Sequence, residues 1–128
     1  LIKVWDMTNE SFKKNLAGHN GLVITLIVNK KNELISGSAD NTIKIWNTTT
    51  GECIRTLVGH SGQVNSLVIN EHDELISGSS DKTIKVWNMT TGECKRNLRG
   101  HTGDVKTLVI YNGDKLISGS TDGTIRFW

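Results

Sequence analysis

The chain has 128 residues, of which 36% are hydrophobic and 22% are charged, and its formal net charge is +2 at pH 7. Because acidic and basic residues are interspersed, no basic stripe points to nucleic acid, and we expect no nucleic-acid partner. No apolar run approaches the roughly 20 residues of a membrane-spanning helix, so we expect no membrane partner either.

One sequence motif recurs along the chain at a constant spacing. Trp5, Trp46, Trp87 and Trp128 are evenly spaced, and Gly-His pairs, Ser-Gly-Ser triplets and an aspartate keep the same step. The stretches 18–58 and 59–99 are identical at more than half of their positions. A period of about 40 without insertions is typical of repeat architectures, in which stacked neighbours bury the faces that one unit cannot bury alone.

We therefore treat residues 1–128 as one repeat region, with a partial repeat at 1–17, full repeats at 18–58 and 59–99, and a partial repeat at 100–128. The first and last five residues stand at the same phase of the repeat. This phase leads us to expect a segment of a longer array.

Each repeat predicts four short β-strands. In the second full repeat, apolar or alternating segments occupy residues 64–69, 74–79, 83–87 and 93–98 in chain order. Residues typical of turns separate them at 71–73, 81–82 and 88–92. Apolar residues never recur at helical spacing beyond one turn, so the sequence predicts an all-β chain of antiparallel meanders.

The Gly-His pair, the Ser-Gly-Ser triplet, the aspartate six residues before a tryptophan and the dipeptide that follows resemble the WD-repeat β-propeller family. The resemblance covers the whole chain, although the name-giving dipeptide is intact only at Trp5-Asp6 and becomes Trp-Asn in the next two repeats. It implies blades of four antiparallel strands in an incomplete propeller of about three blades. The implied innermost strands are 23–28, 64–70 and 105–111, and the outermost are 11–16, 52–58 and 93–98.

A His, a Ser, an Asp and a Trp recur in every repeat. They invite a catalytic interpretation, because triads are defined by geometry and not by chain order. Catalytic sites are normally single, however, whereas this set occurs three times. A buried indole N–H needs an acceptor, a Ser hydroxyl can accept and donate onward, and a His can pass the chain to an Asp.

We therefore predict a structural hydrogen-bond network and no catalytic residue, in agreement with the resemblance. Its predicted members are His19, Ser36, Asp40, Trp46, His60, Ser77, Asp81, Trp87, His101, Ser118, Asp122 and Trp128. Ser38, Ser79 and Ser120 remain alternatives for the serine.

Other chemistry is sparse. Cys53 and Cys94 stand at the place that Phe12 takes in the first repeat, so we predict small apolar packing residues in preference to a disulfide. That pattern suits a reducing compartment, and we expect an intracellular, cytoplasmic protein with the nucleus left open. No ligand spacing typical of zinc and no phosphate-binding glycine motif occurs, so we predict no metal and no cofactor.

Two classes of function fit these features. The first is a non-catalytic scaffold that presents loops to a protein or peptide, and the second is a regulatory or substrate-recognition propeller region of a larger multidomain enzyme. An active site at the axis would favour converging carboxylates, but Lys106 is the only charged residue of the predicted inner strands. The scaffold is therefore our prediction, with a protein or peptide as partner, together with the remaining blades or other copies of the chain.

The repeats differ most in two sets of turns. These turns flank the repeated aspartate and follow the Gly-His pair, and the resemblance places both at one mouth of the propeller. The predicted partner contacts are Asn20, Leu22, Ala39, Asn41, Ser61, Gln63, Ser80, Lys82, Thr102, Asp104 and Thr121. The alternative is free drift of exposed turns, since the turns predicted on the opposite face vary as much.

Overall fold

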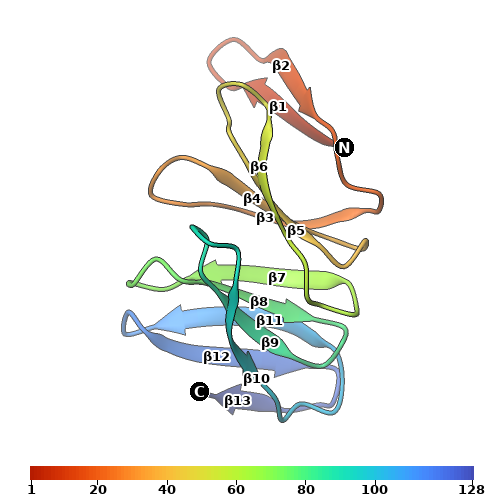
Figure 1. Ribbon diagram of the computed structural model, residues 1–128, viewed down its shortest axis with the longest axis vertical. Helices are drawn as coiled ribbons and strands as arrows, with labels where there is room; N and C mark the ends of the chain where they lie inside the picture. The colour runs from red at the N-terminus through yellow and green to blue at the C-terminus, as the bar shows by residue number, and fades with distance from the viewer.

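The computed structural model describes all 128 residues and contains thirteen β-strands (Figure 1). The strands are β1 (Ile2–Asp6), β2 (Ser11–Leu16), β3 (Val23–Val28), β4 (Leu34–Ser38), β5 (Ile43–Trp46), β6 (Cys53–Leu57), β7 (Val64–Ile69), β8 (Leu75–Ser79), β9 (Ile84–Trp87), β10 (Cys94–Leu98), β11 (Val105–Tyr111), β12 (Lys115–Ser120) and β13 (Ile125–Phe127). No helix is long and apolar enough to cross a membrane.

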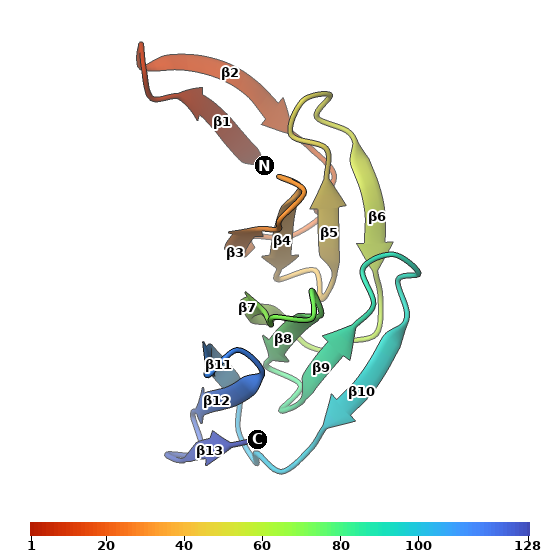
Figure 2. The ribbon, with the colours of Figure 1, turned by 90° about the vertical axis from the view of Figure 1, so that its left-hand side faces the viewer.

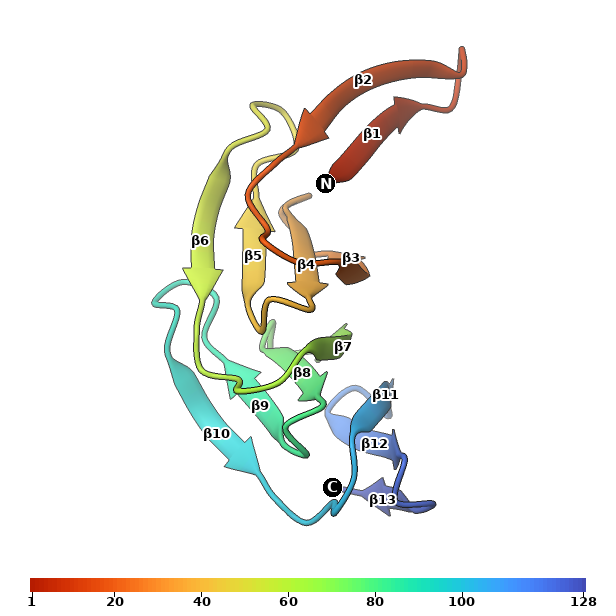
Figure 3. The ribbon, with the colours of Figure 1, turned by 90° about the vertical axis from the view of Figure 1, so that its right-hand side faces the viewer.

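The strands form four antiparallel sheets in chain order. Strands β3–β6 and β7–β10 make two four-stranded sheets, β1 and β2 make a pair, and β11–β13 make a sheet of three. The sheets follow one another along an open arc, with β3, β7 and β11 on its concave side and β6 and β10 on its convex side (Figures 2 and 3). The predicted all-β fold, an incomplete propeller with two complete blades, is confirmed.

The hydrophobic core lies between neighbouring sheets. One cluster joins Ile35, Ile43, Ile45 and Leu57 of the first complete blade to Val64, Leu67, Leu75 and Trp87 of the second. A second cluster joins the second complete blade to β11 and β12 in the same way. Each sheet therefore buries a face by stacking on the next blade, as burial of apolar area requires.

The glycine of the Ser-Gly-Ser triplet lets adjacent blades approach each other. A Cβ atom added at Gly37 would lie 2.7 Å from Val64 Cγ1, and one added at Gly78 would lie 2.7 Å from Val105 Cγ1. Both valines begin the inner strand of the following blade and are fully buried. A side chain at the glycine would push the two blades apart, which explains why the triplet recurs.

The turn between the last two strands of each complete blade reaches back over the preceding sheet. Lys14 donates a hydrogen bond to the carbonyl of Thr49, and Arg55 Nη1 donates one to the carbonyl of Thr91 at 3.1 Å. The turns close at Gly51 and Gly92, with φ of 84° and 82°, which favour glycine. These contacts join the convex sides of adjacent blades.

The predicted packing role of the cysteines is wrong. Cys53 and Cys94 are both exposed and free, at the start of the outermost strands β6 and β10. Phe12, at the same place, is also 48% exposed. An outermost strand has a sheet neighbour on one side only, and its register shifts beside this position, so the side chain faces solvent.

The two open ends of the arc expose apolar positions that are buried elsewhere. Leu26 is 51% exposed, whereas its repeat equivalents Leu67 and Leu108 are 6% and 5% exposed. At the other end Phe127 is 69% exposed, whereas its equivalent Val86 is 2% exposed. The difference reflects the missing neighbour, since the same position is covered wherever an adjacent blade is present.

We expect the 128-residue chain on its own to self-associate, because both open faces are apolar and present unpaired strand edges. Light scattering at tens of micromolar should give a mass well above 14.1 kDa. Leu26→Lys combined with Phe127→Lys should lower that mass towards the monomer. A stable, compact monomer of the unmodified chain at that concentration would contradict this expectation.

Candidate interaction face and its hydrogen-bond network

The twelve predicted network residues come together in three sets of four. In the middle set, Trp87 Nε1 donates to Ser77 Oγ at 2.8 Å, and Ser77 Oγ lies 2.7 Å from His60 Nε2. His60 Nδ1 lies 2.7 Å from Asp81 Oδ2. The sets of Trp46, Ser36, His19 and Asp40 and of Trp128, Ser118, His101 and Asp122 repeat these contacts within 2.6–2.8 Å.

Burial decides the direction of the hydrogen bonds in the middle set. It lowers the pKa of His60 below the usual value of 6.5, despite the opposing effect of the hydrogen bond and charge of Asp81. The ring is therefore neutral at pH 7. Its Nδ1–H donates to the Asp81 carboxylate and its Nε2 accepts from the Ser77 hydroxyl, which in turn accepts from the indole. No buried polar side-chain atom lacks a partner.

Each set includes a threonine that the sequence analysis missed. Thr83 Oγ1 donates to Asp81 Oδ1 at 2.6 Å, and Thr42 and Thr124 make the same bond to Asp40 and Asp122. The signal was present in the sequence, because an Asp-x-Thr phrase recurs at the same step as the tryptophans. The alternative serines Ser38, Ser79 and Ser120 accept instead from the backbone N–H of the aspartate.

The aspartate receives several hydrogen bonds. Burial alone would raise the pKa of Asp81, but the hydrogen bonds from Thr83 and His60 outweigh it and lower the pKa below the usual 3.8. The backbone N–H of Ser61 also donates to Asp81 Oδ2, at 3.1 Å. One carboxylate thus joins the loop before β7 to the turn between β8 and β9.

The arrangement does not provide a serine nucleophile. Ser36 and Ser77 are fully buried, and Ser118 is 1% exposed. Each hydroxyl accepts from an indole and donates to a histidine, and its burial leaves it without access to a substrate. These residues can therefore position the two adjoining loops.

The predicted partner-contact residues all lie on the edge of the blades that carries these loops, on the right of Figure 1. A backbone hydrogen bond joins the two variable loops of each blade, from Ala39 to Leu22, from Ser80 to Gln63 and from Thr121 to Asp104. The exposed members are Asn20, Leu22, Ser61, Lys82, Thr102 and Thr121. Ala39, Asn41, Gln63, Ser80 and Asp104 are half-buried.

The opposite edge of the blades carries a cluster that could hold a metal. Glu71 and His72 of the β7–β8 turn and Asp114 of the β11–β12 turn bring ligand atoms within 4.8 Å of one another. All three are exposed, and exposed acidic groups are common without an ion. The geometry leaves the predicted absence of a metal untested.

The network should contribute to stability as a unit. We expect His60→Ala to lower the free energy of unfolding by about 1–3 kcal/mol, because Ser77 and Asp81 each lose a buried partner. Asp81→Ala should cause a similar loss, and the double variant should lose less than the sum of the two, measured by denaturant unfolding. His72→Ala, which changes an exposed histidine outside the network, is the control. Strict additivity would contradict a connected network.

Acidification should destabilise the chain through the same residues. A lowered pKa of His60 means that the unfolded state binds more protons below pH 6.5, so stability is lost as the pH falls from that value through the lowered pKa. The lowered pKa of Asp81 acts in the same direction below pH 3.8. Unfolding free energies at pH 7 and pH 5 should differ less for His60→Ala than for the unmodified chain. An unmodified chain that is equally stable at both values would overturn this assignment.

Comparison with known proteins identifies the repeat. The family described as WD domain, G-beta repeat matches residues 10–47, 51–88 and 92–128. WD40 propeller domains generally mediate protein interactions, and their fold is typically a non-catalytic scaffold. No curated protein sequence matches the chain.

Solved structures share the arc. A crystal structure of the WD40 β-propeller domain of Doa1 aligns with a TM-score of 0.90 and 27% identity, over 98% of this chain and 42% of that chain. A crystal structure of the computationally designed Ika4 protein aligns with a TM-score of 0.88 and 33% identity, over 98% of this chain and 77% of that one. The present chain therefore spans less than half of the Doa1 chain. Since three copies of the family's repeat cover most of its length, the chain belongs to the WD40 family.

Proposed function

We propose that this chain is a non-catalytic interaction scaffold that holds a protein or peptide on the face formed by the variable loops. The observation that carries the proposal is the combination of fixed backbone and variable side chains in these loops. Asp40, Asp81 and Asp122 hold the same loop geometry in three blades, while the neighbouring exposed side chains differ.

Preorganisation supports a binding role for this face. In each blade the aspartate accepts from the backbone of the loop before the inner strand, and a backbone bond joins that loop to the next turn. A partner would therefore meet loops that are already ordered and would lose less binding energy to ordering them. Asn41 and Lys82 hold φ of 72° at the tips of their turns, which fixes the direction of those side chains further.

The chemistry of the face favours a polar partner segment. The exposed candidates are mostly Asn, Ser and Thr, with one cation at Lys82, one half-buried anion at Asp104 and one apolar side chain at Leu22, which is 79% exposed. Such side chains suit hydrogen bonding to an extended peptide or a loop. If the chain is a region of a larger enzyme, this face would still act as the recognition surface.

The structure also supports proposals for the remaining partners and for the compartment. The open ends would bind further blades of the same propeller or other copies of the chain, because they expose apolar faces. Two free, exposed thiols favour a reducing, intracellular compartment, with the cytoplasm as first choice.

Charge reversal tests the face. Peptides selected on the chain from a random display library serve as probes, and their affinities are measured by titration. Lys82→Glu and Asp104→Lys should weaken the selected peptides by about fivefold or more, since both side chains lie among the loops. The melting temperature should stay unchanged, because neither residue takes part in the network.

Lys115→Glu and Glu71→Lys are the matched controls, at exposed positions on the opposite edge of the blades. They should leave binding and melting temperature unchanged. If only these control substitutions abolish binding, the assigned face is wrong.

A further inference from the structure

A cavity of about 460 Å³ opens between the two complete blades, on the edge opposite the variable loops. Three turns surround it: the β3–β4 turn, the β7–β8 turn and the β9–β10 turn, together with side chains of β6 and β10. Figure 2 shows these three turns side by side, facing the viewer. Cavities of this size are typical of sites for small ligands or projecting side chains.

The most buried part of the cavity lining is apolar. Ile45 and Trp87 belong to it and are only 2% and 1% exposed, because both are part of the core between the blades. Met89 packs against the same core and also lines the cavity. Ile54, which is 50% exposed, adds apolar surface from β6. An apolar side chain that entered here would remove this surface from water.

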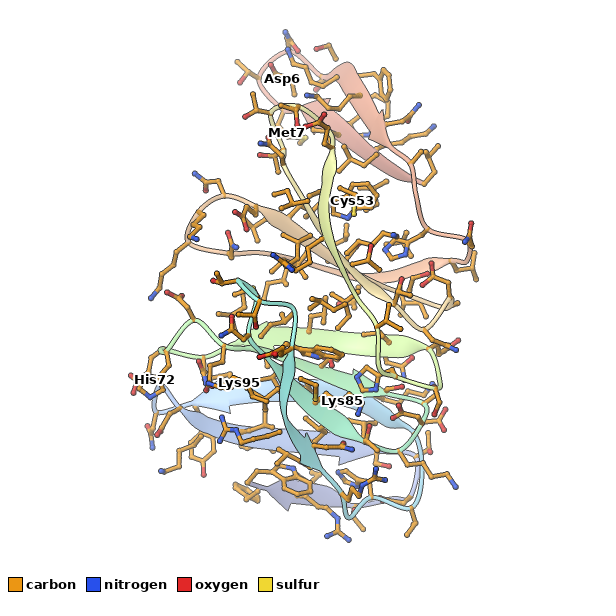
Figure 4. The ribbon with its side chains drawn as sticks, viewed as in Figure 1. Asp6, Met7, Cys53, His72, Lys85 and Lys95 are labelled. Carbon is orange, nitrogen blue, oxygen red and sulfur yellow. The ribbon has the colours of Figure 1, made fainter.

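Most of the charges around the cavity are already paired. Lys30 Nζ lies 3.3 Å from Asp73, and Glu33 accepts from Asn29 Nδ2 at 2.9 Å. Glu74 accepts from Lys95 and Arg96, and the hydrogen bond from Lys95 leads the effects that lower its pKa. Figure 4 shows Lys95 beside the turn that carries His72. Asp73 and Glu74 are thus neutralised by cations, whereas Glu33 accepts from a neutral amide and keeps its negative charge.

Two basic residues of the lining are not neutralised. Lys31 makes no ion pair, and the guanidinium of Arg55 makes one hydrogen bond, to the carbonyl of Thr91. A guanidinium has five N–H donors, so most of those on Arg55 have no protein acceptor. Four basic side chains (Lys30, Lys31, Arg55 and Lys95) and three acidic ones (Glu33, Asp73 and Glu74) line the cavity, so the lining carries an excess of one positive charge.

The repeat equivalent of Arg55 shows that this state is specific to one blade. Arg96 stands at the same place in the next blade, but its Nη2 donates to Glu74 at 2.9 Å. The residue before it is Lys95, which also binds Glu74, whereas the residue before Arg55 is Ile54. The first complete blade thus combines an apolar side chain with an unneutralised guanidinium, and the second combines two cations with a shared carboxylate.

We propose that this cavity binds a short acidic peptide segment that inserts one leucine-sized side chain between the blades and places flanking carboxylates against Arg55 and Lys31. Complementary charge and the apolar part of the lining together select this ligand, because a guanidinium binds a carboxylate in a bidentate manner. The site lies inside the chain, away from both open ends and from the variable-loop face. It is therefore independent of the interaction proposed for that face.

Fluorescence anisotropy with a labelled pentapeptide, Ser-Glu-Leu-Glu-Ser, tests the proposal. Arg55→Gln and Lys31→Gln should each weaken binding by about fivefold or more, which is typical for the loss of a charged hydrogen bond. Arg99→Gln is the matched control, since Arg99 is an exposed arginine outside the cavity that makes no ion pair. It should leave the affinity unchanged, as should Lys82→Gln on the variable-loop face.

Ile54→Glu provides a second variant in case Arg55→Gln loosens the contact with Thr91. It removes apolar surface from the cavity lining and adds a negative charge at a position that is 50% exposed. We expect it to weaken peptide binding by at least about fivefold with no loss of melting temperature. Two altered peptides complete the test: replacing the leucine by alanine, or both glutamates by glutamine, should each weaken binding at least about fivefold.

The proposal is overturned if the alanine or glutamine peptide binds as well as the original, or if Arg99→Gln weakens binding as much as Arg55→Gln. Equal binding of an altered peptide would show that the leucine side chain or the carboxylates are not required. An equal effect of Arg99→Gln would indicate unspecific attraction by positive charge. Loss of binding with Lys82→Gln alone would place the acidic peptide on the other face. That result would overturn this site without affecting the function proposed for the loops.

Discussion

A four-stranded sheet in this protein can bury its apolar faces only against the sheets before and after it. The core clusters cross from one blade to the next, and the glycine of each Ser-Gly-Ser triplet keeps that interface close. The arc, the exposed ends and the interblade cavity all follow from this constraint. Leu26, Leu67 and Leu108 illustrate it directly, because their burial depends on the presence of a neighbouring blade and not on their own identity.

The polar network supplies the hydrogen-bond acceptor that a tryptophan buried between the blades requires. A tryptophan such as Trp87 lies almost wholly inside the interblade core, and its indole N–H must find an acceptor there. The chain of serine, histidine and aspartate carries this requirement outwards until it reaches the backbone of two surface loops. The hydrogen bonds that satisfy the buried indole therefore also fix the geometry of two surface loops. A recognition face requires loops that are ordered in this way.

Most of the fold could be predicted from the sequence because each strand and each network residue recurs in several repeats. The strand expected at 64–69 is β7 (Val64–Ile69), and the strand expected at 93–98 starts one residue later as β10 (Cys94–Leu98). The network residues were found for the same reason. Thr83 was missed although its Asp-x-Thr motif recurs in every repeat, because threonine is also common in strands without such a role. Cys53 was misjudged because equivalence with Phe12 indicated burial that an outermost strand does not provide.

The cavity could not be predicted in this way. Its lining comes from turns of two blades that lie one full repeat apart in the sequence, and its volume depends on how closely those blades stack. Its charge depends on which acceptor each basic side chain reaches, which is a property of three-dimensional spacing. Periodicity reveals what the repeats share, whereas this feature arises from what two neighbouring repeats do differently.

The pair Arg55 and Arg96 carries a wider lesson about duplicated units. The two residues are identical and occupy the same strand position, yet one donates to a backbone carbonyl and the other to a carboxylate. The neighbouring positions, Ile54 and Lys95, are where the two copies diverge. A repeat protein can thus acquire different chemistry at an unchanged residue through substitutions at neighbouring positions. A comparison of the functional position alone would then not reveal that one blade has become specialised.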